Sequence, residues 1–342
     1  MSATVDLADL ARATVPGALI DRLRGARHVL VGTHEHPDAD TLGSGVAIAA
    51  IVEAIGGRAT VVCSDTVPAL YDFLPGMDRV RADPDPDEAY DLLVLCDCGS
   101  PDRVGPIAGR HPSLFGSLPR IVIDHHASNA GAPSDWIDPN AAATCELVAL
   151  LAVRLGIALD ADDGLLANVL MAGIVMDTST FAHPNATPRT LAVAAALVEA
   201  GAPLSDISRR LYRTKPDGQL RLFGRVLDRI ETTPDRRIIW STLTLADLAA
   251  VDADPAHSEG IIELLAQSNT ADVAMLLKEQ PDGTTRLSVR TKPGGVDATV
   301  LTGRFGGGGH ARAAGATIAA PVDVAVERAL AEARPLVDAV RR

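Results

Sequence analysis

The sequence predicts an α/β protein in which a parallel sheet forms the N-terminal domain and a smaller α+β domain follows it. Runs of four or five Val, Ile and Leu residues recur through the N-terminal third and alternate with longer, helix-like segments. Strands that are apolar on both faces and alternate with helices are typical of a parallel sheet covered by helices on both sides. A chain of 342 residues also suffices for two domains, each with its own core.

Polar residues follow the expected strands of the N-terminal half. These strands cover residues 28–32, 59–63, 92–96 and 120–123, and the expected helices cover 45–55, 143–155, 163–176 and 188–200. Ser44 is a candidate N-cap of the first of these helices. His34, Asp97 and Asp124 each follow an expected strand. Because open α/β sheets bind ligands beyond the carboxyl ends of their strands, we expect these three side chains at one edge.

An Arg-rich amphipathic stretch that starts at Ser208 is predicted to be a linker helix. It divides the chain into a first domain at residues 1–207, the linker at 208–234 and a second domain at 235–342. The second domain is expected to contain strands at 237–242, 272–278 and 285–290, and helices at 258–267 and 321–340.

Charge and composition exclude several classes of protein. The formal net charge is −13 and no basic stripe is visible, whereas proteins that hold long nucleic acids neutralise the phosphates with Lys and Arg. A nucleic-acid substrate would therefore have to be short. No stretch reaches 18 uninterrupted apolar residues, so we expect no membrane span and a cytoplasmic location. The four cysteines lack zinc-knuckle spacing and are expected to be reduced and buried.

Six side chains form the candidate metal site. After the first strand, His34, Asp38 and Asp40 lie close together on a loop, and oxygen-plus-imidazole ligand sets suit Mn²⁺, Mg²⁺ or Fe²⁺. Asp97 ends an apolar strand, where an unpaired carboxylate would be costly. Each of these residues alone could equally be a helix cap or part of a structural ion pair. The complete set of candidate ligands is His34, Asp38, Asp40, Asp97, His125 and Asp177.

The charges of these residues indicate two cations. Four carboxylates in one pocket repel one another and require protonation or counter-ions. Two divalent cations carry four positive charges and balance the four Asp residues, and the two His residues complete the ligand set. This is the composition of a two-metal hydrolase, in which the ions lie ~3.5–4 Å apart.

A run of four glycines, Gly306 to Gly309, precedes His310 near the C-terminal end. Backbone N–H groups without neighbouring Cβ atoms can line an anion-binding concavity. No Lys-Ser or Lys-Thr follows, so the run is not a Walker loop. Arg290, at the end of an expected strand, has a guanidinium that could hold a phosphate or stack on a base. The alternative interpretation of the glycine run is a flexible hinge.

These segments together resemble the DHH phosphoesterase superfamily with its DHH-associated C-terminal domain. The N-terminal resemblance rests on His34-x-x-Pro37-Asp38-x-Asp40, the isolated Asp97, the triplet Asp124-His125-His126, and Gly173-Ile174-x-x-Asp177-Thr178. The C-terminal resemblance rests on Gly307-Gly308-Gly309-His310-x-x-Ala313-Ala314-Gly315. The resemblance extends over nearly the whole chain, from about residue 28 to residue 315.

The resemblance implies a role for each candidate residue. Asp97 would bridge both metals; His34 and Asp38 would hold one of them, and Asp40, His125 and Asp177 the other. His126 would face the substrate phosphate, so Asp97 and His126 are the catalytic candidates. His36 stands at a variable position of the family motif and is not assigned. The substrate-binding candidates are Arg290, Gly307, Gly308, Gly309 and His310.

Among the subgroups, the compact architecture resembles the NrnA group of bifunctional oligoribonucleases and PAP phosphatases. This implies hydrolysis of short RNA and of 3′-phosphoadenosine 5′-phosphate (PAP), two Mn²⁺ ions (or Mg²⁺) per chain, and a homodimer. The Ala- and Arg-rich composition resembles actinobacterial members that also act on cyclic di-AMP and pApA. Two alternatives are a single-strand exonuclease of RecJ type, which the length disfavours, and a nucleotide sensor without catalysis, which the intact ligand set disfavours.

Overall fold

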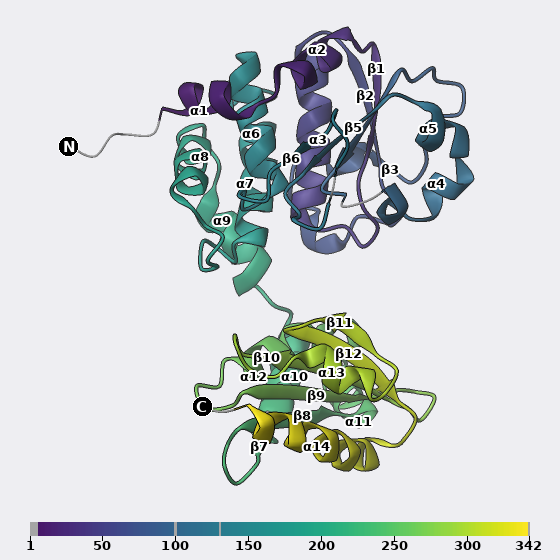
Figure 1. Ribbon diagram of the computed structural model, residues 1–342, viewed down its shortest axis with the longest axis vertical. Helices are drawn as coiled ribbons and strands as arrows, with labels where there is room; N and C mark the ends of the chain where they lie inside the picture. Colours follow the sequence, from purple (N-terminus) through teal and green to yellow (C-terminus); the bar gives the residue numbers. More distant parts are fainter. Residues whose placement is uncertain (1–5, 99–100, 130, 341–342) are drawn as a thin grey trace, which may run out of the picture. The chain divides into compact units, whose positions relative to one another are not determined.

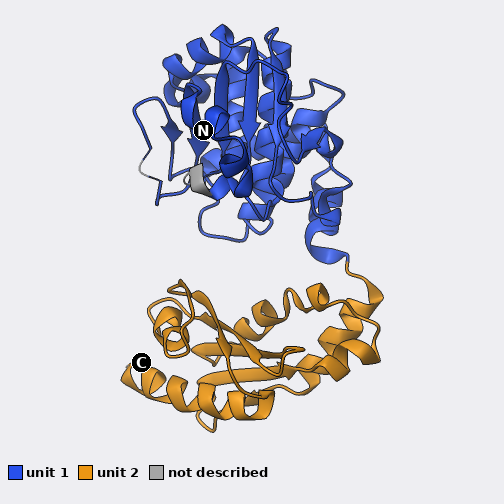
Figure 2. Ribbon diagram, turned by 90° about the vertical axis from the view of Figure 1, so that its right-hand side faces the viewer, with its two compact units in different colours: residues 1–214 blue, residues 215–342 orange. Residues whose placement is uncertain are grey.

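The chain folds into two compact units, residues 1–214 and 215–342 (Figure 2). This computed structural model describes residues 6–98, 101–129 and 131–340. The linker helix predicted over 208–234 is not one helix. Helix α9 (Leu204–Ser208) continues into a π-helical turn at Arg209–Arg213, and α10 (Asp217–Asp228) begins the second unit. Pro216 separates them, because proline lacks the N–H of a helix interior and disfavours helical backbone at the preceding residue.

The first unit contains a six-stranded sheet in the order β3-β2-β1-β4-β5-β6, and all its pairs are parallel. The strands are β1 (His28–Gly32), β2 (Arg58–Val62), β3 (Val80–Arg81), β4 (Leu92–Cys96), β5 (Arg120–Asp124) and β6 (Trp136–Ile137). The predicted parallel sheet is thus confirmed. Strands β3 and β6 were not predicted, because two residues give no periodic pattern. The strand order reverses between β1 and β4, which is where doubly wound sheets bind their ligands.

Helices cover both faces of this sheet (Figure 1). Val29 and Val31 of β1 face the larger core, which contains α3, α6 and α7, whereas Leu30 faces a smaller core with α4 and α5. This alternation follows from the two-residue period of a strand. The helices are α1 (Leu7–Thr14), α2 (Gly17–Gly25), α3 (Ala39–Ala54), α4 (Pro106–Arg110), α5 (Pro112–Ser117), α6 (Thr144–Leu155), α7 (Leu165–Asp177), α8 (Pro188–Glu199) and α9.

Helix α3 begins six residues earlier than the sequence analysis expected, and Ser44 is not its N-cap. The Asp38 carboxylate accepts hydrogen bonds from the backbone N–H groups of Asp40 and Thr41, so Asp38 caps the helix. Ser44 lies inside the helix and its hydroxyl donates to the carbonyl oxygen of Thr41. The earlier start matters because it places Asp40 in the first turn of a buried helix.

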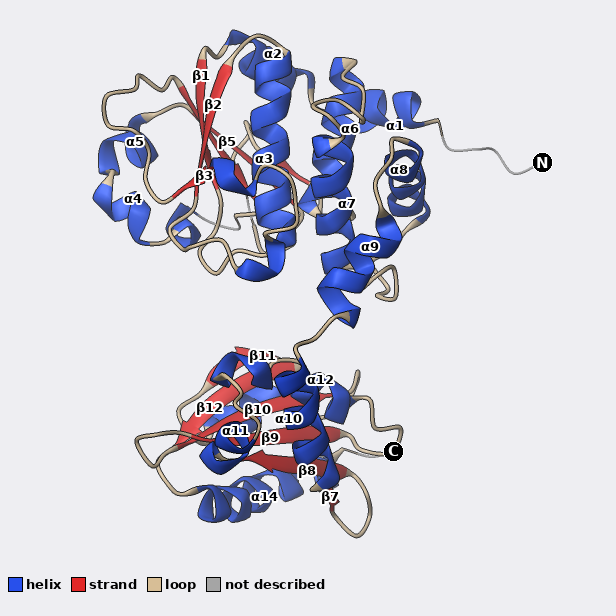
Figure 3. Cartoon of the chain, turned by 180° about the vertical axis from the view of Figure 1, so that it is seen from behind, coloured by secondary structure: helices blue, strands red, loops and turns tan. Residues whose placement is uncertain are grey.

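The second unit is built on a mixed sheet in the order β11-β12-β10-β9-β8-β7 (Figure 3). The strands are β7 (Glu231–Thr232), β8 (Ile238–Leu243), β9 (Val273–Glu279), β10 (Thr285–Thr291), β11 (Gly308–His310) and β12 (Ala313–Ile318). The helices are α10, α11 (Leu245–Ala250), α12 (Ile261–Ala266), α13 (Ala298–Gly303) and α14 (Val322–Ala339). One face packs on α13 and α14, and the other packs on α10, α11 and α12. The predicted smaller α+β domain is confirmed.

Two further expectations concern the whole chain. All four cysteines are free and buried, as predicted. No single helix among the described residues is long and apolar enough to cross a bilayer, although Pro188–Glu199 and Leu204–Arg213, bent by 114°, meet the length and composition criteria as a pair.

Candidate metal centre

The six predicted ligand residues meet at the carboxyl edge of the first sheet. His34 follows β1, Asp97 follows β4 and His125 follows β5, while Asp40 lies in the first turn of α3 and Asp177 is the last residue of α7. Asp97 has a left-handed backbone with a φ of 57°, a conformation that is uncommon outside glycine and recurs at functional sites. Five separate elements therefore deliver polar side chains to the point where the strand order reverses.

The ligand atoms fall into two groups that share Asp97. The Nε2 atom of His34 lies 3.4 Å from Oδ2 of Asp97 and 4.0 Å from Oδ1 of Asp38. The Nε2 atom of His125 lies 3.0 Å from Oδ2 of Asp177, 3.5 Å from Oδ1 of Asp97 and 3.9 Å from Oδ2 of Asp40. Asp97 thus turns one carboxylate oxygen toward each group.

Both histidines present a lone pair to these groups. Nδ1 of His34 lies 2.7 Å from the carbonyl oxygen of Glu35, and Nδ1 of His125 lies 3.4 Å from that of Ala141. A carbonyl oxygen only accepts, so in the neutral form of each ring Nδ1 carries the proton and Nε2 has the lone pair that a metal requires. Nε2 of His125 is buried, and its nearest carboxylate oxygen, Oδ2 of Asp177 at 3.0 Å, is an ion-pair partner without the geometry of a hydrogen bond. These donors fit divalent cations.

The electrostatics of the centre also call for positive charge. Burial, together with the charges of Asp97 and Asp177, raises the pKa of Asp40 well above its usual value. Burial lowers the pKa of His125, but the carboxylates of Asp177, Asp40 and Asp97 outweigh it and raise that pKa to about 10. Without metal, Asp40 and His125 thus tend to hold protons at this centre. Two divalent ions could replace those protons, because metal ligands bind in their deprotonated forms.

Backbone groups of α6 hold the Asp40 carboxylate in place. The N–H groups of Thr144 and Cys145 donate to its two oxygens at 2.7 and 2.8 Å, and the Thr144 hydroxyl donates to Oδ1 of Asp97 at 3.0 Å. Helix α6 has no side-chain cap of its own, since its N-cap residue is Ala143. The Asp40 side chain, 104 residues before Thr144 in the sequence, acts as the cap of this helix instead. Thr144 was missed by the sequence analysis, and the only signal was a helix that starts without a capping residue.

Asp124 lies beside the two groups and orients His126. It is fully buried; its Oδ1 accepts a hydrogen bond of 2.8 Å from Nδ1 of His126, and its Oδ2 accepts one of 2.8 Å from Asn129. The Asp124 hydrogen bond raises the pKa of His126, although burial opposes it. The side chain of His126 is 37% exposed, so a ligand can reach it. His36 is exposed, pairs with Asp65 and takes no part in either group.

Comparisons with known proteins identify the two domains of the chain. Residues 28–174 match the model of the DHH family, N-terminal domain, and residues 242–339 match the DHHA1 domain. The bifunctional oligoribonuclease and PAP phosphatase NrnA of Thermus thermophilus is 31% identical over 90% of this chain and 89% of its own length. The chain belongs to the DHH family. DHH proteins of this kind are phosphoesterases, and this chain is therefore one.

A second relative and a solved structure also match this DHH protein over most of its length. NrnA of Bacillus subtilis is 25% identical over 85% of this chain and 89% of its own length. An exopolyphosphatase-related protein from Bacteroides fragilis, of known structure, has the same fold, with a TM-score of 0.80 and 23% identity over 94% of this chain and 98% of its own.

Glycine at position 173 allows α7 to approach Asp40. A Cβ atom there would clash with Sγ of Cys145 and lie 2.6 Å from Oδ1 of Asp40. We expect Gly173→Ala to lower the free energy of unfolding by about 1–3 kcal/mol and to weaken metal binding by displacing the carboxylate. Thermal denaturation and Mn²⁺ titration measure both effects. The matched control is Gly109→Ala, also in a helix, where a Cβ meets nothing within 4 Å. Metal affinity unchanged in Gly173→Ala would show that this packing does not position Asp40.

The predicted substrate-binding residues lie on the DHHA1 sheet. Arg290 pairs with Ala313 and Ala313 with His310, so these residues form one row across three strands. Residues directly opposite in antiparallel strands share a face, which places the side chains of Arg290 and His310 on the same face, with their backbones about 10 Å apart. His310 is exposed, whereas Arg290 is half-buried and donates to Glu263 at 2.8 Å. A phosphate would therefore have to share or displace this partner.

The second half of the glycine run is paired as a strand, and Gly306 and Gly307 precede it. Gly308–His310 form β11, and a Cβ at position 309 would lie 2.6 Å from the carbonyl oxygen of Ala313. A Cβ at position 307 would lie 2.6 Å from Cβ of Ala316. The glycines thus let β11 approach β12 closely. Gly307 and Gly308 also line a cavity of about 420 Å³, together with Arg286 and Phe305.

Proposed function

We propose that this chain is a two-metal phosphodiesterase and phosphatase that hydrolyses short oligoribonucleotides and 3′-phosphoadenosine 5′-phosphate to mononucleotides. The observation that carries the proposal is the position of Asp97, whose two oxygens face two separate groups of metal-ligand atoms. A single-metal site needs only one such group. Mn²⁺ is the expected ion, because a mixed set of imidazole and carboxylate ligands favours a borderline cation over Mg²⁺.

Each side chain has a task in this proposal. His34 and Asp38 hold the first ion, and Asp40, His125 and Asp177 hold the second, with Asp97 shared between them. Two ions, when bound, provide an activated water molecule and stabilise charge on the scissile phosphate. Asp124 fixes the ring of His126 through Nδ1, so that the other ring nitrogen can hydrogen-bond a phosphate oxygen. Hydrogen bonds from Thr144, at the N-terminus of α6, hold the carboxylates of Asp40 and Asp97 in fixed positions relative to each other.

Short substrates fit the charge of the protein. The net charge of −13 opposes binding of long nucleic acids, whose affinity depends on many phosphate contacts. The two NrnA relatives are oligoribonucleases and PAP phosphatases, which supports the same substrate class for this chain. We assign the recognition of the substrate's terminal phosphate or base to the DHHA1 sheet, through Arg290 and His310.

Product analysis tests this proposal. The full chain with Mn²⁺ is incubated separately with pApA, PAP, short RNA, cyclic di-AMP and long single-stranded RNA, and products are separated chromatographically. We expect AMP from pApA and from PAP, and no processive degradation of the long RNA. Preferential degradation of the long RNA would support the RecJ-type alternative, and the absence of turnover on every substrate would support a sensor.

Arg290→Ala and His310→Ala are each expected to raise KM for pApA by at least about tenfold, because the substrate loses a positioning contact worth roughly 1.4 kcal/mol. Bound metal should stay at two ions per chain. Steady-state kinetics on pApA and on a generic activated phosphodiester provide the measurement, and the generic ester should be affected less.

Glu263→Gln separates the two explanations for an Arg290 defect. This substitution removes the ion pair but leaves the guanidinium available. If Arg290 binds substrate, KM in Glu263→Gln should not rise. A KM raised as much as in Arg290→Ala would show that the ion pair itself supports the structure, and the assignment of Arg290 to substrate would then be wrong.

A further inference from the structure

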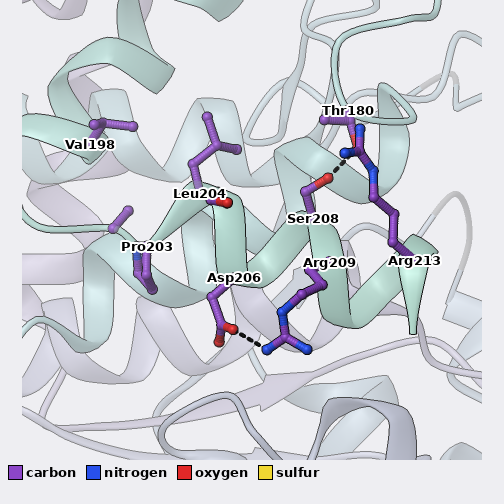
Figure 4. A pocket seen from close by; sticks show the side chains of 10 residues that line it. Thr180, Val198, Pro203, Leu204, Asp206, Ser208, Arg209 and Arg213 are labelled. Atoms are coloured by element: carbon purple, nitrogen blue, oxygen red, sulfur yellow. Dashed lines mark hydrogen bonds and ion pairs between the residues drawn. The ribbon is translucent and has the colours of Figure 1, made fainter. Parts of the chain in front are cut away.

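A cavity of about 710 Å³ lies in the first unit (Figure 4), and none of the six candidate metal ligands lines it. Its walls come from α9, the π-helical turn at Arg209–Arg213, the end of α8, and Thr180. The lining is mixed: it contains the apolar side chains of Val198 and Leu204, the hydroxyl groups of Thr180 and Ser208, and three charged side chains, those of Asp206, Arg209 and Arg213. Its size lies within the range of small-molecule sites, roughly 300–1,000 Å³.

The cavity lining contains two arginines and one acid, Asp206, and the segment that contributes the arginines is basic. Residues 209–215 contain four cations and no acid, in a chain of net charge −13. Asp206 accepts hydrogen bonds from both Arg209 and Arg210. Arg213, in contrast, has no hydrogen-bond or ion-pair partner among residues 6–98, 101–129 and 131–340, and its side chain extends toward Thr180 and Ser208 (Figure 4). A free guanidinium beside two hydroxyl groups suits a phosphate.

The cavity wall is connected to the metal centre. Ser179, Thr180 and Phe181 have φ angles of 48°, 58° and 62°, and three consecutive left-handed residues without glycine are strained. This turn directly follows the metal-ligand candidate Asp177 and Thr178. Oγ1 of Thr180 lies 3.2 Å from Oγ of Ser208 in the cavity wall, and the hydroxyl of Tyr212 donates to the carbonyl oxygen of Met176 at 2.7 Å.

We propose that this cavity binds the phosphate of a nucleoside monophosphate, with Arg213, Thr180 and Ser208 holding the phosphate and Val198 and Leu204 contacting the nucleoside. The choice of a nucleoside monophosphate as the ligand rests on the proposed function, because that reaction releases mononucleotides from short strands. The ligand is either a free mononucleotide or one nucleotide of a longer strand; both offer the same chemistry. Because the wall is bonded to the segment around Asp177, occupancy is expected to alter the rate at the metal centre.

The test is the number of AMP molecules bound per chain, measured by calorimetric titration of the full-length protein with Mn²⁺ present. We expect Arg213→Glu to lose one bound AMP relative to wild type, or to weaken it at least tenfold, and Arg213→Lys to show a smaller loss. The matched control is Arg24→Glu, the same charge change on an exposed Arg of α2, a helix far from α9 in Figures 1 and 3. This control should bind AMP as the wild type does.

The wild type should bind one AMP more than Arg213→Glu whether or not the proposed function of the metal centre is correct. If the proposed function fails, the wild type binds one AMP and Arg213→Glu none; if it holds, AMP occupies the catalytic centre as well, and the counts are two and one. Equal AMP binding in Arg213→Glu and Arg24→Glu would overturn the cavity proposal in either case.

Kinetics identify the source of the nucleotide. If the cavity takes part of a strand, Arg213→Glu should raise KM for tri- and tetranucleotides and leave KM for PAP unchanged. If it takes a free nucleotide, added AMP should change the rate on a generic phosphodiester in the wild type, saturably, and have a weaker effect in Arg213→Glu. Either pattern supports the site. If neither pattern is seen and Arg213→Glu binds as many AMP molecules as the wild type, the proposal is contradicted.

Discussion

Asp97→Asn is expected to lower kcat by at least about 100-fold, which corresponds to about 2.7 kcal/mol of transition-state stabilisation. Asp97 is 2% exposed and is the only one of the six candidate ligands whose two oxygens face different groups. An amide offers one oxygen to metal instead of two and carries no charge, so the pair of ions loses its shared ligand. Steady-state kinetics and metal content measured on the same sample check this prediction.

The fold should survive this substitution. Asp97 contributes one of several carboxylates that repel one another in the buried centre, so the metal-free Asn variant should unfold at a temperature no lower than the metal-free wild type. Asp65→Asn is the control, because it removes a carboxylate that pairs with His36, close in sequence to the candidate ligand His34, but that belongs to neither ligand group. More than a tenth of wild-type activity in Asp97→Asn, with two ions retained, would contradict the bridging role.

Exhaustive chelation is expected to reduce turnover to background, and added Mn²⁺ should restore it better than Mg²⁺. Chelation should also lower the melting temperature, since an ion that binds only the folded chain stabilises it by about 2.7 kcal/mol at a concentration 100 times its Kd. Asp97→Asn should show a smaller thermal shift on Mn²⁺ addition than the wild type. Full activity after chelation, with metal content verified as zero, would contradict a metal-dependent mechanism.

The strands of the first unit and its candidate metal ligands could be predicted from the sequence, because they depend on short, local patterns of residues. Strands β1 and β4 have the predicted bounds, since each is a continuous apolar run between turns. The candidate ligands could be selected because His34, Asp97 and His125 follow strands, and the parallel arrangement then brings the strand ends together. The early start of α3 was not visible, because Asp38 reads equally as a loop residue and as a cap.

Features that depend on tertiary contacts could not be read from the sequence. Thr144 supports Asp40 across 104 residues, and the pairing of Arg290 with Glu263 depends on the position of α12 beside β10. Strand β12 consists mainly of Ala and Gly, whose small side chains give no strand pattern. It pairs with Gly308 and Gly309 of the glycine run, for which the sequence indicated an anion-binding concavity or a hinge. The cavity beside Arg213 arises from a π-helical turn for which the sequence gives no rule.

The most direct test of a two-metal centre is a titration of metal-free protein with Mn²⁺ in which bound ions per chain and turnover of pApA are measured together. We expect two ions per chain in the wild type, with turnover appearing only as the second ion binds. We also expect Asp38→Asn and Asp177→Asn, which lie on opposite sides of Asp97, each to lose one ion and most of the turnover. Full turnover with a single bound ion, or two tightly bound ions in both variants, would contradict a two-metal centre.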